Sequence, residues 1–498
     1  MDDATPARID AYRALRADLL RDPHRPLWHL TSPEHGDAMP FDPNGAFHWR
    51  GQHHLFHIFQ HRDPESGSVI HAWGHLSSID LLHWRHHPTA LDVAPNDPDR
   101  SIFSGNAFLD RDGTPTLCYH GVGIGNSLAH ARDPEADPAL EQWVKHPGNP
   151  IVPIPKPGDP GHGVYESWDP HAWVEDGMCH ACFGGKIPAH FVGPDWDHLA
   201  HTGPFLEDDT LSDDEDDVSC PDFFAIGDRH ALVAISHQKG VRWWTGDWDG
   251  KRLRATRQDR VTWPGGLYFA PETMALPDGR RILWGWVLDP RPYDPARGWS
   301  GVMGSPVEIT LDNEGGLRFA PARELMALRY RPTPIPHGPL PGMLAGVATE
   351  SADLECVLDP GSARRIVCSV RRSPDGAEHT DIIVDLEKHT LSIDFSESGD
   401  PDIHHRGWVI TPFRDPAEKE RRWHTQTAPF EHPAGALLHL RILVDRSVIE
   451  VHAGGTRWLV QRVFPTRPDS LGIALSADAN DARVVEGTVW EMAPTNPY

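Results

Sequence analysis

Apolar residues between residues 26 and 331 recur in short runs bounded by Gly, Pro, Asp and Asn. Such runs are typical of β-strands, and we expect strands at residues 52–60, 69–77, 116–120, 172–183, 230–236 and 280–287. No helical spacing of comparable strength occurs in this part of the sequence. Short strands over roughly 300 residues indicate one large all-β unit, and a propeller protects strand edges better at that size than one sandwich does.

Different patterns flank this unit. Apolar residues near helical spacing predict a leading helix over residues 7–22, packed on the outside of the main domain. The proline-dense segment 332–341 is typical of an extended linker. After it, strands are expected at residues 354–358, 365–371, 381–386, 438–444 and 448–452, enough for one β-sandwich. We therefore divide the chain into a helical extension (1–26), a propeller (27–335) and a sandwich (345–498).

Composition and charge limit the classes of molecule that the protein is expected to bind. The 498-residue chain has a formal net charge of -26, whereas nucleic-acid and anionic-membrane binding depend on clustered Lys and Arg. Its 19 Trp, 48 Pro and 44 Gly together indicate many turns and many flat aromatic faces, of the kind that line carbohydrate sites. We expect a small carbohydrate as ligand, with neither a nucleic acid nor a membrane as partner, and leave a homo-oligomer open.

The cysteines and the N-terminus add two expectations. The six Cys are scattered, and Cys179 and Cys182 form a C-x-x-C pair without a second pair at zinc spacing. We interpret that pair as part of a buried strand and expect no metal and no cofactor. The N-terminus has no basic and apolar leader pattern, and no run approaches the roughly 20 apolar residues of a membrane span, which predicts a cytoplasmic protein.

The first candidate for chemistry is Asp42, in the segment 41–45 with the sequence F-D-P-N-G. Pro fixes φ and Asn-Gly readily takes positive φ, so Asp42 is expected at a turn that the following strand anchors. A carboxylate held in this way is a candidate nucleophile. In isolation the same motif also builds an Asx-turn between two strands, so the later motifs decide between the two interpretations.

Those later motifs occur in a recognisable order. They are L-F-H-I-F-Q at 55–60, W-G-H-L-S-S-I-D-L-L-H-W at 73–84, F-S-G-N at 103–106, W-D-P at 168–170, S-C-P-D-F-F at 219–224, and L-R-I-L-V-D-R-S-V-I-E-V at 440–451. Together with F-D-P-N-G they resemble glycoside hydrolase family 32, the β-fructofuranosidases that include invertases, inulinases and levanases. The resemblance implies a five-bladed β-propeller followed by a C-terminal β-sandwich.

The resemblance also implies roles for individual residues. Asp42 matches the family's nucleophile, and Asp169 matches the Asp that stabilises the transition state. Packing between blades would explain Trp73 and Phe103 equally well, and Gln60 could instead satisfy a backbone group. The residues expected to bind substrate are Asn44, Gln60, Trp73, Phe103, Ser104, Trp168, Ser219 and Glu272.

The chain departs from the family pattern at three positions. Phe41 stands where the family has Asn, and Trp168 where it has Arg, so aromatic surface replaces hydrogen-bonding groups. Ser219 stands where the family has its acid/base Glu, and a hydroxyl cannot supply that acidity near neutral pH. A relocated acid/base is therefore required for hydrolysis.

Four residues are candidates for the relocated acid/base. Asp217 comes first, because alternation along a strand places it on the same face as Ser219, although the acidic run 213–217 is also typical of a solvated loop. Glu166, beside the W-D-P motif, is the second catalytic candidate, and a surface carboxylate would look the same. Glu272 and His237 are weaker candidates.

The sequence thus predicts a retaining glycosidase acting on β-fructofuranosides or related furanosides through Asp42. Retaining hydrolysis needs two carboxyl groups, one that attacks the anomeric carbon and one that protonates the leaving oxygen. A fructosyl transferase on the same scaffold, and a non-catalytic carbohydrate-binding protein that has lost its acid/base at Ser219, are the alternatives.

Overall fold

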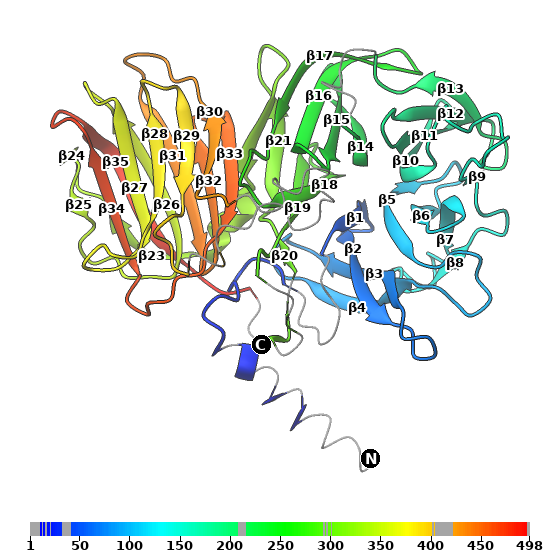
Figure 1. The fold of residues 1–498 in the computed structure, drawn as a ribbon, viewed down its shortest axis with the longest axis horizontal. Coiled ribbons are helices and arrows are strands. Elements are labelled where there is room, and N and C mark those ends of the chain that lie inside the picture. Colours follow the sequence, from blue (N-terminus) through cyan, green and yellow to red (C-terminus); the bar gives the residue numbers. More distant parts are fainter. Residues whose placement is uncertain are drawn as a thin grey trace.

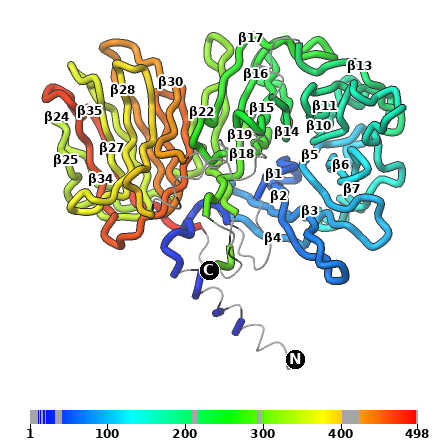
Figure 2. The backbone as a smooth tube through the Cα atoms, viewed as in Figure 1, coloured from blue at the N-terminus to red at the C-terminus, as the bar shows by residue number. Residues whose placement is uncertain are grey.

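The computed structural model of the chain describes residues 10–11, 13–14, 17–19, 21–31, 41–207, 216–291, 294, 297–299, 301–400, 403 and 422–495. Within these residues the protein is all-β, with a ring of five sheets beside a two-sheet sandwich (Figures 1 and 2). This confirms the expected fold class of a five-bladed propeller followed by a C-terminal β-sandwich.

Each propeller blade begins with its innermost strand. These strands are β1 (Pro43–Trp49), β5 (Ile102–Leu109), β10 (Trp168–Glu175), β14 (Ser219–Ile226) and β18 (Tyr268–Ala275). Each contacts the next around the ring, and β18 contacts β1, so the ring is closed and has no free edge. All five innermost strands begin at the same end of the propeller axis, so the residues at their starts lie close together.

The outer strands complete the blades as antiparallel meanders. The first blade adds β2 (Gln52–Arg62), β3 (Val69–Ser78) and β4 (Arg85–Leu91), and the second β6 (Pro115–Gly121), β7 (Gly125–Ala131), β8 (Trp143–Lys145) and β9 (Val152–Pro153). The third adds β11 (Met178–Gly184), β12 (Ala189–Gly193) and β13 (Ala200–Pro204), and the fourth β15 (Arg229–Ser236), β16 (Gly240–Trp248) and β17 (Leu253–Arg260). The fifth adds β19 (Arg281–Val287), β20 (Val302–Met303), β21 (Val307–Leu311) and β22 (Leu317–Pro321).

The single strand predicted over residues 172–183 was wrong. β10 ends at Glu175 and β11 begins at Met178, with Asp176 and Gly177 between them at φ of 50° and 77°. An Asp-Gly pair with two positive φ angles is a favoured two-residue hairpin turn. Cys179 and Cys182 both lie on β11 and are buried.

The sandwich packs two sheets around one hydrophobic core. The seven-stranded sheet contains β23 (Arg329–Pro334), β24 (Gly338–Pro339), β26 (Ser351–Asp359), β31 (Leu438–Asp445), β32 (Val448–Ala453), β33 (Arg457–Arg462) and β35 (Arg483–Met492). The six-stranded sheet contains β25 (Gly342–Met343), β27 (Arg365–Arg372), β28 (Thr380–Asp385), β29 (Thr390–Asp394), β30 (Thr425–Pro429) and β34 (Gly472–Ala477).

The proline-dense segment 332–341 is not the predicted linker. Its residues contribute to β23 and β24, which pair with β35 in the sandwich. β23 lies at the edge of its sheet, where a missing N–H costs no ladder hydrogen bond. The connection between the domains is instead the 3₁₀ helix η2 (Arg323–Leu328), directly before β23.

The described residues between Asp10 and Arg21 are helical, as the sequence predicts. Leu19 is buried in the propeller core, whereas Asp10, Ala11, Arg13 and Ala14 are exposed. The apolar positions Ile9, Tyr12, Leu15 and Leu20 lie outside the described residues. Among the described residues, no helix has both the length and the apolar character that crossing a membrane requires.

The segment after this helix is held by the sandwich. The backbone N–H groups of Leu27, Trp28 and His29 donate to the Asp445 carboxylate at 2.7, 2.9 and 2.9 Å. The His29 ring contacts Asp445 and Glu450, at 2.9 and 3.1 Å. Glu450 also accepts the backbone N–H of Ser305, on the propeller, at 2.9 Å. The D-R-S-V-I-E part of the C-terminal motif therefore joins the N-terminal segment, the propeller and the sandwich.

Candidate functional site

The candidate site lies where the innermost strands begin. Asp42 directly precedes β1, Ser104 is near the start of β5, Asp169 near that of β10, and Cys220 near that of β14. Ser104 Oγ donates to Asp42 Oδ2 at 3.0 Å, and the backbone N–H of Cys220 donates to Asp169 Oδ2 at 2.9 Å. Cys220 takes a positive φ of 45°, an uncommon conformation for a non-glycine residue that directs this N–H to Asp169.

The turn that presents Asp42 is braced on both sides. Ile58 N–H and the Asn44 side-chain amide both donate to the Asp42 carbonyl oxygen at 2.9 Å. Asn44 Oδ1 in turn accepts the N–H of Gly105 at 2.9 Å. Gly45 has a φ of +54°, and a Cβ there would lie 2.9 Å from the Phe56 ring. Asn44 therefore orients the turn from inside the propeller, which is a positioning role.

The two aspartates share a desolvated environment. Burial, with the nearby charge of Asp169, raises the pKa of Asp42 to about 8, although the hydrogen bond from Ser104 and the charge of His237 act in the opposite direction. Burial also raises the pKa of Asp169, against the hydrogen bond from Cys220. Asp42 Oδ1 is buried and has no hydrogen-bond partner among the described residues. The hydrogen-bonding capacity of this oxygen is therefore not used by any described residue.

Ser219 belongs to a chain of hydrogen bonds beside these aspartates. Trp168 Nε1 donates to Ser219 Oγ at 2.9 Å, and Ser219 Oγ donates to Asp217 Oδ2 at 3.0 Å. Asp217 also accepts the backbone N–H of His237 at 2.8 Å and faces its Nδ1 at 2.6 Å. Ser219 itself is only 1% exposed, so it supports Trp168 and Asp217 instead of presenting a group to a ligand. Asp213 and Asp214 lie outside the described residues.

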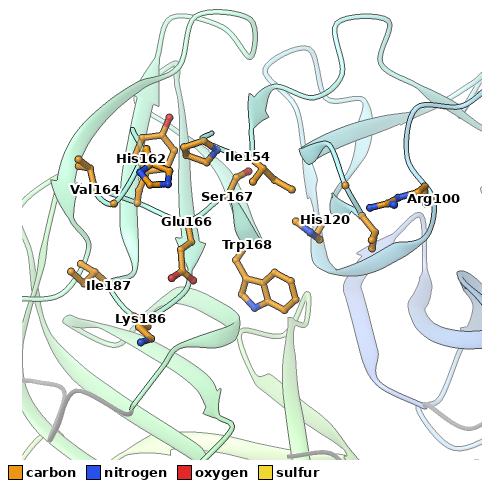
Figure 3. A pocket seen from close by; sticks show the side chains of 15 residues that line it. Arg100, His120, Ile154, His162, Val164, Glu166, Ser167, Trp168, Lys186 and Ile187 are labelled. Atoms are coloured by element: carbon orange, nitrogen blue, oxygen red, sulfur yellow. The ribbon is translucent and has the colours of Figure 1, made fainter. Parts of the chain in front are cut away.

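A cavity of about 720 Å³ opens beside Trp168. Figure 3 shows Arg100 and His120 on one side of it, Glu166, Lys186 and Ile187 on the other, and Trp168 between them. Further walls come from apolar residues, among them Val122, Ile154, Pro155 and Val164. Glu166 is thus placed on an exposed cavity wall, and none of its described contacts joins it to Asp42 or Asp169.

Three residues that were expected to bind substrate, Trp73, Phe103 and Gln60, differ in their burial and contacts. Trp73 is 0% exposed and its Nε1 donates to the Phe103 carbonyl oxygen at 3.0 Å, so the expectation that it touches substrate was wrong: it braces the wall from behind. Phe103 is half-buried, and its ring meets the Trp168 ring edge to face at 6.0 Å. Gln60 Nε2 pairs with His71 Nε2 at 2.8 Å, so its described side-chain contact is structural.

Glu272 faces a different space. It accepts the N–H of Ala46 at 3.1 Å and, with His171, Asp222 and Arg281, lines a second cavity of about 300 Å³. The lining residues come later along the same innermost strands than Asp42 and Asp169 do, so this cavity lies further along the propeller axis. Burial and the charge of Asp222 raise the pKa of Glu272 well above its ordinary value.

Sequence reasoning missed several residues of the larger cavity. Arg100, His120 and Lys186 come from loops or strand ends of different blades, and no local motif singles them out. Cys220 carried a signal, since it lies inside the S-C-P-D motif. Its Sγ lies 3.7 Å from Asp169 Oδ2 and 3.4 Å from Ser104 Oγ.

Comparisons with known proteins find relatives and a similar fold along nearly the whole chain. The sucrose-6-phosphate hydrolase of Klebsiella pneumoniae is 29% identical over 94% of this chain and 94% of its own length. The fructan 6-exohydrolase of Beta vulgaris is 26% identical over 95% of this chain and 87% of its own length. The fold is similar to the crystal structure of fructan 1-exohydrolase IIa from Cichorium intybus, with a TM-score of 0.78, 20% identity and coverage of 95% of this chain and 98% of that one.

Family descriptions cover most of the chain. Residues 32–321 match "Glycosyl hydrolases family 32 N-terminal domain", and residues 329–491 match "Glycosyl hydrolases family 32 C terminal". The first of these matches contains Asp42, Asp169 and Ser219, and the second contains the strands that hold the N-terminal segment. The chain therefore belongs to glycosyl hydrolase family 32.

Proposed function

We propose that this protein is a retaining glycosidase acting on fructose-containing di- or oligosaccharides, with Asp42 as nucleophile and Asp169 as the transition-state stabiliser. The observation that carries the proposal is the Asp42 carboxylate, pinned through Oδ2 by Ser104 while Oδ1 stays buried and unpartnered. A carboxylate held in place in this way suits attack on an anomeric carbon. Membership of family 32 supports the reaction class.

We base the proposed positions of the furanose ring and of the leaving group on the geometry of the site. The furanose ring binds over Asp42 and Asp169, and the cavity beside Trp168 receives the leaving group. Hydrogen bonds from sugar hydroxyls to Asp169 strengthen as charge develops on the ring, which lowers the barrier. Trp168, which lines the cavity where the family has a hydrogen-bonding side chain, favours a furanoside bound with more aromatic contact than the family pattern provides, whereas Phe41 is buried in the propeller core and does not face the ligand.

Ser219 supports a second candidate function. With a hydroxyl at the acid/base position, the protein would bind a furanoside without turning it over unless another residue supplies the proton. A transferase is distinguished from a hydrolase only by the acceptor, which is a sugar instead of water. We place the glycosidase first, because the chain keeps both aspartates in their braced positions.

The test is product release from a panel of furanosides, with Asp42→Asn as control. The panel contains sucrose, short inulin-type and levan-type oligosaccharides, and arabinofuranosides. Sucrose 6-phosphate is added because the Klebsiella relative is named for it and because Arg100 and Lys186 are in the cavity wall. Turnover that Asp42→Asn abolishes supports the glycosidase. Binding by calorimetry without turnover of any member supports the binding protein.

A further inference from the structure

His237 and Asp217 form a pair at the edge of the candidate site. Asp217 Oδ1 accepts the His237 backbone N–H at 2.8 Å, and Oδ2 lies 2.6 Å from His237 Nδ1. A carboxylate accepts, so Nδ1 is the protonated nitrogen in this contact and Nε2 is left to face other groups. Among the described residues, Nε2 makes no hydrogen bond.

We propose that His237 is the general acid/base of this enzyme, oriented by Asp217, in place of the glutamate that the family pattern expects at Ser219. The inference rests on the proposed glycosidase function. It assigns to Asp217 a positioning role instead of the proton-donating role that the sequence suggested.

The position of the pair supports this assignment. Ser219 opens β14 and pairs with Ile235 on β15, and His237 follows the end of β15. Ser219 Oγ donates to the same Asp217 oxygen that faces His237. The pair therefore lies next to the position from which the family's acid would act, across one antiparallel strand pair.

Exposure separates His237 from Ser219, and the described contacts separate it from the other candidates. The His237 side chain is 30% exposed, so a ligand can reach it, whereas Ser219 is buried. In its described hydrogen bonds with Ser219 and His237, Asp217 is the acceptor. Glu166 is exposed on the wall of the leaving-group cavity, but none of its described contacts joins it to Asp42 or Asp169. Glu272 lines the second cavity further along the axis.

Charges around the imidazole favour the form that donates a proton. Burial lowers the pKa of His237, but the hydrogen bond and charge of Asp217 and the charges of Asp169 and Asp42 outweigh this, and the net shift is upward. The Phe269 ring meets the imidazole edge to face at 6.0 Å. The cations nearest along the chain, Lys239 and Arg242, both contact Asp216.

The proposed reaction balances in two steps. First, one Asp42 oxygen bonds to the anomeric carbon while the glycosidic C–O bond breaks, and the proton on His237 Nε2 passes to the departing oxygen. The leaving alcohol is neutral, and so is the imidazole. Next, Nε2 takes a proton from water as the water oxygen bonds to the anomeric carbon and the Asp42 ester bond breaks. This restores the Asp42 carboxylate and the imidazolium.

The experiment compares two leaving groups on His237→Ala and His237→Gln. A sugar leaving group needs a proton, whereas 4-nitrophenolate leaves without one. On the sugar substrate that the wild type turns over, we expect kcat/KM, which reports the first bond-breaking step, to fall about 10²–10⁴-fold. On 4-nitrophenyl β-D-fructofuranoside we expect a much smaller loss of kcat/KM. Its kcat should still fall, because both substrates share the base-assisted second step, and azide, which needs no base, should restore it in the alanine variant by forming fructosyl azide.

Two further variants complete the test. Asp217→Asn should move the alkaline limb of the kcat/KM profile to lower pH, because the imidazolium loses its counter-charge. His198→Ala is the matched control, since His198 makes the same Nδ1 contact with a carboxylate, Asp195 at 2.6 Å, on an exposed turn. Its profile should equal that of the wild type.

The outcomes distinguish this inference from the proposed function. Full activity of both His237 variants on the sugar substrate, with Asp42→Asn inactive, contradicts the role of His237 alone. Equal losses of kcat/KM on the sugar and the nitrophenyl substrates also contradict it, because proton donation in the first step matters only for the sugar leaving group. A wild type that releases no product from any substrate overturns both proposals.

Discussion

Removing Asp445 should destabilise the protein strongly, because its carboxylate holds the N-terminal segment to the sandwich. It is 0% exposed and receives the N–H groups of Leu27, Trp28 and His29 and the ring of His29. Asp445→Ala leaves these buried donors without an acceptor. Each such group costs about 1–3 kcal/mol, and the losses are not additive because water partly replaces the carboxylate.

We therefore expect a loss of about 3–5 kcal/mol, the range for breaking a buried charged contact. For a cooperative unit of roughly 150–250 residues, 1 kcal/mol shifts the Tm by about 2–4 °C, so the transition of the sandwich should fall by roughly 6–20 °C. Calorimetry measures this shift. Asp228→Ala removes an exposed carboxylate in the β14–β15 turn and should leave the Tm nearly unchanged. A fall of less than about 2 °C in Asp445→Ala would refute the reasoning.

Two other predictions concern stability and the Asp42 turn. Burial lowers the pKa of His54 and His57 to about 3 in the folded protein. At pH values below about 6.5, the ordinary pKa of histidine, the unfolded state therefore binds more protons than the folded state. The free energy of unfolding should decrease as the pH is lowered, by up to ~1.4 kcal/mol per pH unit for each histidine. Urea denaturation near pH 7, 6 and 5 checks this, and a constant midpoint contradicts it. Gly45→Ala should cost more stability than Gly51→Ala in the same assay, since both have positive φ but only the Gly45 Cβ meets Phe56, at 2.9 Å. Equal losses would show that the contact is unimportant.

Much of the fold follows from local pattern. The run at residues 52–60 became β2 (Gln52–Arg62), and that at 448–452 became β32 (Val448–Ala453). The break between β10 and β11 also had a local signal, the Asp176-Gly177 pair, which was overlooked. The prolines of residues 332–341 led to the wrong prediction of a linker, because an edge strand tolerates proline where a central strand does not. The blade number came from the family resemblance, because no repeat period marks the blades.

Individual site residues could be predicted from the sequence, but the contacts between them could not. Asp42 and Asp169 were identified through motifs, and they meet because both lie at the starts of innermost strands. Asp217 and His237 were separate candidates, and their pairing depends on the register of β14 against β15, which no single strand reveals. The contact of His29 with Asp445 joins residues 416 positions apart, so no local pattern could show it.

The most direct test of the account is product release by the wild type and by Asp42→Asn from the furanoside panel, followed by chromatography of the sugars. The account predicts that the wild type releases fructose or a related furanose from at least one member, with retained anomeric configuration in the first product. It predicts that Asp42→Asn, folded and still able to bind, releases none. Turnover that survives this substitution would contradict the role of Asp42, and binding without turnover by the wild type would show that the protein is not a glycosidase.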